Sequence, residues 1–239
     1  MKRNLTMKFK TNILSLIIAF GGVLPLAAQQ PSPLQRSMHS QPGATTPVTN
    51  EAPDNLDALD KYGLLSANPL GKTSDLIKKF MLKEGMTLLN GTLGKSNAIN
   101  VEKMRNGEVL VVTICASSLF MPNDTTLRPD ASKLLAPFKR YLKNPDMFWV
   151  ILDMHTDNTG SEEYTDNLSL QRVNSVFDWF VDEDCDTRYL FPTASGANEP
   201  LPGENNESID SRNKNRRLEI LLVPGKKMVQ EAAKGRIAF

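Results

Sequence analysis

The chain has 239 residues, of which 40% are hydrophobic and 23% charged, a composition typical of a globular protein that excludes collagen-like and wholly disordered chains. Its 28 basic and 27 acidic side chains give a net charge of +1, so no surface for nucleic acid is expected. Two cysteines and two histidines are too few for a disulfide scaffold and leave little material for a metal centre, so we expect no bound metal or cofactor.

Residues 1–28 have the features of a secretory signal peptide. Four basic side chains precede the apolar run Ile13–Leu26, which ends at the small residues Ala27 and Ala28. This run has 14 residues, fewer than the roughly 20 that a membrane-spanning helix needs. We therefore expect cleavage after Ala28, which would leave 24 basic and 27 acidic side chains. The alternative is an uncleaved N-terminal anchor whose positive charges hold its start in the cytoplasm.

Two segments of different character follow. Residues 29–57 contain five prolines among many polar side chains, which predicts a disordered linker. Residues 58–106 form a preamble, in which a helix is expected over residues 72–92 because apolar side chains recur at near-helical spacing, namely Leu76, Phe80, Leu82 and Met86. Such a helix either packs on its own domain or binds a partner, which would be another protein or a second copy in a homodimer.

A folded domain is predicted over residues 107–224. Its first strand is the β-branched run 108–115, after which Leu127–Asp130 opens a helix that Pro137 should kink or delay. The expected inner face of this helix consists of Leu134, Leu135, Phe138 and Leu142. An apolar second strand is predicted over residues 147–154.

The second half of the domain repeats this alternation. A polar turn over residues 156–160 leads to a helix expected from Ser169 to Asp182, with Ser169 as its N-cap. Its inner face would be Leu170, Val173, Phe177 and Phe180. A loop over residues 192–206 precedes a last strand over residues 217–223. The pattern predicts an α/β fold (an α+β sandwich) of βαβαβ type, with a mixed sheet and helices on one face.

Two further features lie in or beside this domain. Cys115 and Cys185 could form one disulfide or remain two buried thiols, and thiols are favoured because Cys115 lies in a predicted core strand. The C-terminal tail, residues 225–239, is basic and amphipathic, so a short solvated helix is expected there.

Asp157 and Arg172 are the candidate ligand-binding pair. Asp157 lies in the turn directly after a predicted strand, and Arg172 follows fifteen residues later near the start of the next predicted helix. An arginine in the first turn opposes the helix dipole, which favours a role other than helix stability. A carboxylate beside a guanidinium could bind the ammonium and the carboxylate of an amino acid. An ordinary ion pair that fixes the turn is the alternative.

Three motifs resemble the OmpA-like (OmpA/MotB/Pal) C-terminal domain. They are His-Thr-Asp-Asn-Thr-Gly at residues 155–160, Leu-Ser-Leu-Gln-Arg at 168–172 and Asn-Arg-Arg-Leu-Glu-Ile at 215–220. The resemblance covers about residues 107–224 and implies the family's fold. It also implies non-covalent binding of peptidoglycan through the diaminopimelate of the stem peptide, in the periplasm and with an association with the outer membrane left open.

The resemblance assigns site residues one by one. The family's aspartate and arginine fall on Asp157 and Arg172, and a further polar ligand falls on Asn123. Thr165 stands where family members often have asparagine, which puts affinity and stem-peptide preference in question. Arg216 helps to shape the site in the family, and its alternative role is to buttress the last helix-to-strand turn.

We expect a binding protein and not an enzyme. A lone His155 without a nucleophile motif more readily orients the turn than catalyses a reaction. Two alternatives remain: an N-terminally anchored structural or stator-like protein, with an envelope protein as partner of the preamble, and a wall hydrolase that uses the acidic residues.

Overall fold

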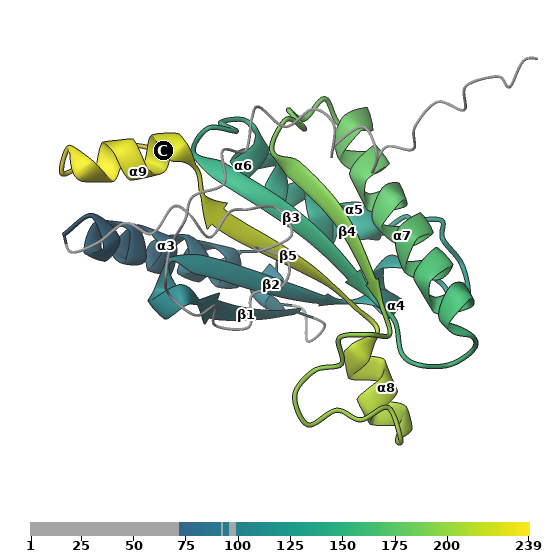
Figure 1. Cartoon of the computed structure of the whole chain (residues 1–239). Helices are drawn as coiled ribbons and strands as arrows, with labels where there is room; N and C mark the ends of the chain where they lie inside the picture. The colour runs from purple at the N-terminus through teal and green to yellow at the C-terminus, as the bar shows by residue number, and fades with distance from the viewer. Residues whose placement is uncertain (1–71, 92, 96–98) are drawn as a thin grey trace, which may run out of the picture. The chain divides into compact units, whose positions relative to one another are not determined.

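The computed structural model describes residues 72–91, 93–95 and 99–239, so the predicted signal peptide, the linker and the start of the preamble lie outside it (Figure 1). Within this part of the chain, none of the helices combines the length and apolar character required to cross a membrane. The strands are β1 Ile99–Met104, β2 Val109–Cys115, β3 Phe148–His155, β4 Leu190–Gly196 and β5 Arg217–Pro224. The α-helices are α3 Lys72–Asn90, α4 Ala116–Leu119, α5 Ala131–Leu135, α6 Lys139–Leu142, α7 Glu162–Asp182, α8 Ile209–Asn215 and α9 Lys226–Ala233.

The five strands form one mixed sheet in the order β1-β2-β5-β3-β4 (Figure 1). β3 and β4 are parallel and are connected through α7, whereas the other neighbouring strands are antiparallel. The predicted mixed sheet is therefore confirmed, with β5, the last strand in the chain, at its centre between β2 and β3.

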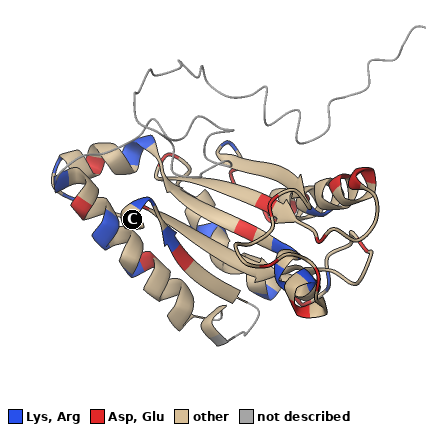
Figure 2. Ribbon diagram, turned by 60° about the horizontal axis from the view of Figure 1, so that its bottom comes forward, with Lys and Arg blue, Asp and Glu red and all other residues tan. Residues whose placement is uncertain are grey.

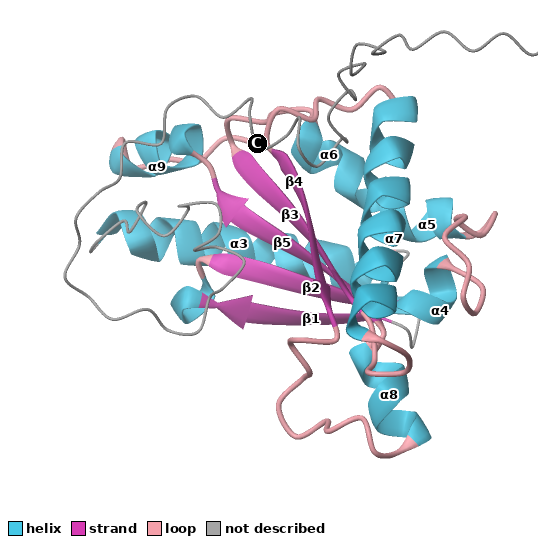
Figure 3. Ribbon diagram, turned by 45° about the vertical axis from the view of Figure 1, so that its right-hand side comes forward, coloured by secondary structure: helices cyan, strands magenta, loops and turns pink. Residues whose placement is uncertain are grey.

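The core lies between the sheet and the helices on one of its faces (Figure 3). Because side chains alternate along a strand, Val150, Leu152 and Met154 of β3 point into this core. The opposite face carries a smaller cluster that includes Ile151 of β3 and residues from the neighbouring strands: Val109, Val111, Phe191, Leu221 and Val223. The predicted arrangement, with helices on one face, is thus confirmed.

The predicted helix of the preamble is present as α3, and it packs on its own domain. Its buried face consists of Ile77, Met81 and Leu88, which belong to the main core. The prediction that Leu82 and Met86 belong to this face was wrong, because these side chains are 44% and 55% exposed. Apolar residues lie on both sides of α3, so spacing alone could not show which side meets the sheet.

The preamble also contains a strand that the sequence analysis missed. β1 pairs antiparallel with β2 at the edge of the sheet. Its polar residues Asn100, Glu102 and Lys103 hide the apolar alternation by which a strand is recognised. An edge strand needs few apolar side chains, because it is only partly covered by the rest of the protein. α3 and β1 are therefore parts of the same structure as the strands that follow.

Pro137 interrupts the helical segment between β2 and β3, as predicted. α5 ends at Leu135, residues 136–138 form a short 3-10 turn and α6 continues from Lys139. Pro137 lacks an N–H group, so the regular helix cannot run through it. The predicted inner residues are buried except Leu134, which is half-buried.

α7 starts earlier than predicted. It begins at Glu162, with Ser161 as the N-cap, and the Ser161 hydroxyl accepts a hydrogen bond from the Tyr164 N–H at 3.2 Å. Ser169, the predicted N-cap, is fully buried inside the helix, where its hydroxyl donates to the carbonyl oxygen of Asp166. The prediction was wrong because the first two turns of α7 are mostly exposed and lack the apolar spacing on which it relied.

The Ser161 cap should contribute measurably to stability. We expect Ser161→Ala to lower the free energy of unfolding by about 1 kcal/mol, because one N–H at the helix start loses its acceptor. Urea unfolding measures this change. Ser132→Ala is a suitable control, because that exposed hydroxyl donates to a carbonyl and caps no helix. Equal effects of the two substitutions would contradict the assignment.

Residues 190–196 form β4, although a loop was predicted from residue 192. Pro192 suggested a loop, but β4 lies at the edge of the sheet, where a strand tolerates proline. The loop after β4 leads to α8, which the sequence analysis also missed. The Ser208 hydroxyl accepts a hydrogen bond from the Ser211 N–H at 3.0 Å and caps this helix.

The tail contains the expected helix, α9, but the helix is not solvated on all sides. Met228 and Ala232 are buried against the core, and α9 lies beside α3 (Figures 1 and 3). The ring of Phe239 stacks on Tyr141, with centroids 5.9 Å apart. The apolar side of the amphipathic tail therefore packs on the domain.

Both cysteines are free. Cys115 ends β2 and Cys185 follows α7, and each is half-buried. The thiols favoured in the sequence analysis are free in the structure, but the expectation that they are buried was wrong, because Cys115 lies at the end of its strand and Cys185 in the loop after α7.

Candidate functional site

A cleft of about 730 Å³ lies where α4, α7 and α8 meet the turn after β3. Its volume is within the usual range for small-molecule sites. All five residues predicted for the site line it: Asn123, Asp157, Thr165, Arg172 and Arg216. Three separate chain segments therefore converge on one cavity, as the predicted ligand site requires.

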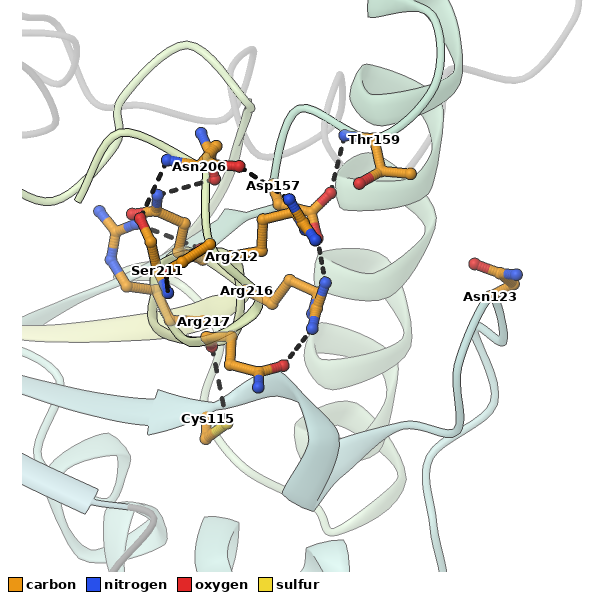
Figure 4. A network of polar contacts seen from close by, with 12 residues as sticks. Cys115, Asn123, Asp157, Thr159, Asn206, Ser211, Arg212, Arg216 and Arg217 are labelled. Carbon is orange, nitrogen blue, oxygen red and sulfur yellow. Dashed lines mark hydrogen bonds and ion pairs between the residues drawn. The ribbon is translucent and has the colours of Figure 1, made fainter.

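Asp157 is held in the turn that follows β3. One carboxylate oxygen accepts a hydrogen bond from the Thr159 N–H at 2.7 Å, and the other forms an ion pair with Arg216 (Figure 4). The residue is only 4% exposed. Burial alone would raise the pKa of this carboxyl group, but the hydrogen bonds from Thr159 and Arg216 outweigh burial and lower the pKa below its ordinary value. Asp157 is therefore a fixed negative charge.

Arg172 is a buried cation on α7. Its Nε and Nη2 atoms donate to the carbonyl oxygens of Asp124 at 2.9 Å and Met121 at 3.2 Å. Its guanidinium carbon lies 5.0 Å from the centre of the Phe120 ring, a cation–π arrangement. Burial lowers the pKa of Arg172, but an arginine remains charged at neutral pH. The loop between α4 and α5 therefore holds this charge in one orientation.

The position of Arg172 in its helix corrects the dipole argument. Since α7 begins at Glu162, Arg172 lies ten residues inside the helix and not in its first turn. The unfavourable effect at a helix N-terminus falls off within one turn, so it does not apply here. The case for a binding role rests on the cleft instead.

Arg216 links α8 to the turn after β3. Its guanidinium group pairs with Asp157 and also donates to the side chain of Asn213 (Figure 4). Its side chain is 35% exposed and lines the cleft. The two roles considered for this residue are thus compatible, because the contact that connects the two turns also presents a positive charge to the cavity.

The short helix α8 is held by a network of polar contacts with the loop that precedes it (Figure 4). The Asn215 side chain donates to Asn206 and to the carbonyl oxygen of Glu204, and it accepts from the Leu201 N–H. Asn215 is fully buried. The asparagine of the Asn-Arg-Arg motif therefore anchors the loop that precedes α8 and sets the direction of Arg216.

Asn123 and Thr165 also line the cleft, but the side chain of each forms a hydrogen bond within the protein. Asn123 has a positive φ of 57°, and its side-chain oxygen accepts a hydrogen bond from the Tyr164 hydroxyl at 3.1 Å. The Thr165 hydroxyl donates to the Glu162 carbonyl oxygen at 2.9 Å, within α7. The hydroxyl of Thr165 is therefore already engaged within its helix, whereas an asparagine there would present an amide.

Three neighbours of these residues were not predicted from the sequence. Tyr164 supports Asn123, Phe120 lies under Arg172, and Asn213 holds Arg216. Recognition of Ser161 as the N-cap would have placed Tyr164 in the first turn of α7, next to the predicted site. Asn213 gave no signal of its own, because its role depends on α8.

His155 does not line the cleft. It lies on the face of the sheet opposite the main core and is 1% exposed, close to Asp153 and Glu219.

Residues 119–216 match the model of the OmpA family. These residues form an OmpA-like domain. The matched residues include all five lining residues predicted above, so the OmpA-like domain and the cleft coincide.

Individual relatives agree with this assignment. The putative lipoprotein YfiB of Escherichia coli is 30% identical over 105 residues, which are 44% of this chain and 64% of the relative. The outer membrane protein A of Bordetella avium is 28% identical over 116 residues, or 48% of this chain and 59% of the relative. The chain therefore spans about three fifths of the length of these relatives.

A solved structure shows the same fold. A putative MotB-like protein from Desulfovibrio vulgaris superposes on the chain with a TM-score of 0.55 and 22% sequence identity. The superposition covers 64% of this chain and 95% of that one. At this identity the likeness concerns the arrangement of the sheet and helices.

Proposed function

We propose that the OmpA-like domain binds peptidoglycan non-covalently through the diaminopimelate of the stem peptide. The observation that carries the proposal is that Asp157 and Arg172, a fixed anion and a fixed cation from different elements, line the same cleft. A free amino-acid group has an ammonium and a carboxylate on one carbon, and the cleft offers a partner of opposite charge to each.

The charges suggest how the ligand is oriented. The ammonium group would approach Asp157, where it would share the carboxylate with Arg216. The ligand carboxylate would approach the guanidinium groups of Arg172 and Arg216, which can form paired hydrogen bonds. Arg172 is already oriented by two backbone carbonyls, so little side-chain entropy remains to be lost on binding.

Binding of this kind would localise the protein to the cell wall, in the periplasm. An outer-membrane association fits the names of relatives such as the outer membrane protein A of Bordetella avium. Cleavage after Ala28 and an uncleaved, stator-like anchor remain alternatives, because both concern residues outside the described part. N-terminal sequencing of the mature protein distinguishes them.

The proposal is tested by co-sedimentation of the purified protein with peptidoglycan sacculi. We expect the protein to pellet with sacculi and to be released by a soluble stem peptide that contains diaminopimelate. A matched peptide with lysine lacks the second carboxylate and should compete poorly. Equal competition by both peptides would contradict the role of diaminopimelate, and a protein that stays in the supernatant would contradict wall binding.

We also propose that the domain binds without catalysing a reaction. Of the described residues that line the cleft, Asp157 alone carries a carboxylate, and glycan cleavage usually needs two. Incubation with purified wall should therefore release no muropeptides. Their appearance would support the hydrolase alternative.

Arg216 should contribute to affinity as well as to the arrangement of the turns. We expect Arg216→Gln to weaken wall binding about 10–100-fold, because a hydrogen bond to a charged group is lost. The melting temperature should also fall, because the buried Asp157 loses the ion pair that connects the two turns. Arg212→Gln is the control, since Arg212 donates to the carbonyl oxygens of Asn206 and Glu207 and does not line the cleft. Unchanged binding of Arg216→Gln would leave Arg216 with the buttressing role alone.

A further inference from the structure

A second polar cluster lies on the sheet outside the cleft. Asp153 and His155 lie two residues apart on β3, on the same face, and Glu199 follows β4. One ligand atom from each of these three residues lies within 4.8 Å of the others. Asp153 and His155 are 2% and 1% exposed, which is unusual for ionisable groups on a sheet.

A fourth residue belongs to this cluster through the register of the sheet. Glu219 of β5 lies directly opposite Asp153. The His155 Nε2 atom is 3.7 Å from Asp153 Oδ2 and 3.9 Å from Glu219 Oε2. Figure 2 shows that charged residues interrupt the otherwise uncharged central strands. Two carboxylates therefore turn one oxygen each toward the same imidazole nitrogen.

The other carboxylate oxygens of Asp153 and Glu219, and the backbone of Glu199, are held by neighbouring groups. The Ser195 hydroxyl donates to Asp153 Oδ1 at 2.7 Å. The Arg217 Nε atom donates to Glu219 Oε1 at 2.6 Å, and its Nη2 atom donates to the Glu199 carbonyl oxygen at 3.2 Å. In many proteins, a hydrogen bond to one oxygen of a carboxylate orients this group as a metal ligand, because the other oxygen stays directed at the ion.

The strand geometry brings His155 into place. The register between β3 and β4 shifts between Met154 and His155. An irregularity of this kind changes the direction of a side chain and is common beside functional sites. It lies at the end of β3, directly before the turn that carries Asp157.

The charges of the cluster are also unequal. Asp153, Glu199 and Glu219 bring three negative charges, and Arg217 brings one positive charge. Together these four side chains carry two net negative charges, which a divalent cation would balance. An imidazole and carboxylates are suitable ligands for zinc and similar transition metals, whereas calcium and magnesium prefer oxygen alone.

We propose that Asp153, His155, Glu199 and Glu219 bind one divalent transition-metal ion, with zinc as the best match. The site is distinct from the cleft and does not depend on peptidoglycan binding. It goes against our expectation from the sequence, where two histidines left little material for a metal centre. Bound metal would connect β3, β5 and the loop after β4, and so would stabilise the folded chain.

The test uses the full mature protein after treatment with a chelator and dialysis. Calorimetric titration with zinc chloride should show one binding site per chain, and zinc should raise the melting temperature. Titration with cobalt(II) chloride should produce the visible absorption of a low-symmetry cobalt site. The cobalt spectrum is recorded on the wild-type chain, so it does not depend on the folding of a variant.

Three variants locate the ion. Glu219→Gln removes a proposed ligand from the partly exposed edge of the cluster and should abolish the zinc-dependent shift in melting temperature. Ser195→Ala removes the support of Asp153 and should weaken zinc binding about 10–100-fold. Asp186→Asn, which removes a carboxylate in the loop after α7, should bind zinc like the wild type.

Two outcomes would overturn the proposal. The first is the absence of zinc and cobalt binding by the wild-type chain. The second is a zinc effect that Glu219→Gln leaves unchanged, which would place the ion elsewhere. Loss of wall binding with intact zinc binding, or the reverse, shows that the two sites fail independently.

Discussion

Asp157→Asn and Arg172→Lys are each expected to lose wall binding while keeping the fold. Asparagine keeps the acceptor for the Thr159 N–H but removes the charge that would hold the ligand ammonium. Lysine keeps a positive charge but cannot form paired hydrogen bonds. Leaving one partner of a buried charge pair unmatched costs about 2–5 kcal/mol, so affinity for sacculi should fall about 30-fold or more. Co-sedimentation over a range of sacculus concentrations measures this loss.

The matched controls are Asp186→Asn and Arg188→Lys. These two residues form an exposed ion pair of 2.7 Å beyond the C-terminal end of α7, remote from the start of the helix where the cleft lies. Both controls should pellet with sacculi like the wild type. Circular dichroism and melting temperature confirm folding of all four variants. Wild-type affinity of both cleft variants would show that the ligand binds elsewhere.

Phe148→Ala is expected to have the largest effect on stability. Phe148 begins β3 and is fully buried. Its ring lies 4.8 Å from Tyr141, 5.0 Å from Phe239 and 6.1 Å from Phe80, so it connects α6, the C-terminal tail and α3. Removal of a buried phenylalanine side chain costs about 3–5 kcal/mol, through lost burial and the cavity that remains.

Urea unfolding of Phe148→Ala and of Ile209→Ala measures this effect. Ile209 begins α8 and is 68% exposed, so its truncation should change stability by less than about 0.5 kcal/mol. One cooperative transition in both variants would also show that α3 unfolds together with the sheet. A loss below 1 kcal/mol for Phe148→Ala would contradict the central place of this aromatic cluster.

The sequence alone was sufficient for the parts of the fold with a strong local signal. β2, β3 and β5 are apolar runs that are buried on both faces for most of their length, and such runs predict strands with little ambiguity. Pro137 marked the break between α5 and α6, because proline lacks the N–H group that a helix interior requires. The motifs around Asp157 and Arg172 pointed to the family.

The local signal failed where an element is stabilised mainly by its surroundings. The first turns of α7 carry polar residues, and their position follows from the Ser161 cap and from packing farther along the helix. β1 and β4 are the two edge strands, and each contains residues that are unusual for a strand, such as Pro192. An edge strand pairs on one side only, so its sequence is less constrained.

The sequence determined which charged residues this protein has near its motifs, and the tertiary structure decided which of them meet. Asp157 and Arg216 are separated by 59 residues, and their contact depends on β3 and β5 being neighbours in the sheet. The same pairing places Asp153 opposite Glu219, and so creates the second cluster. No local pattern encodes these contacts, because they result from strand order and register, which the packing of the whole core selects.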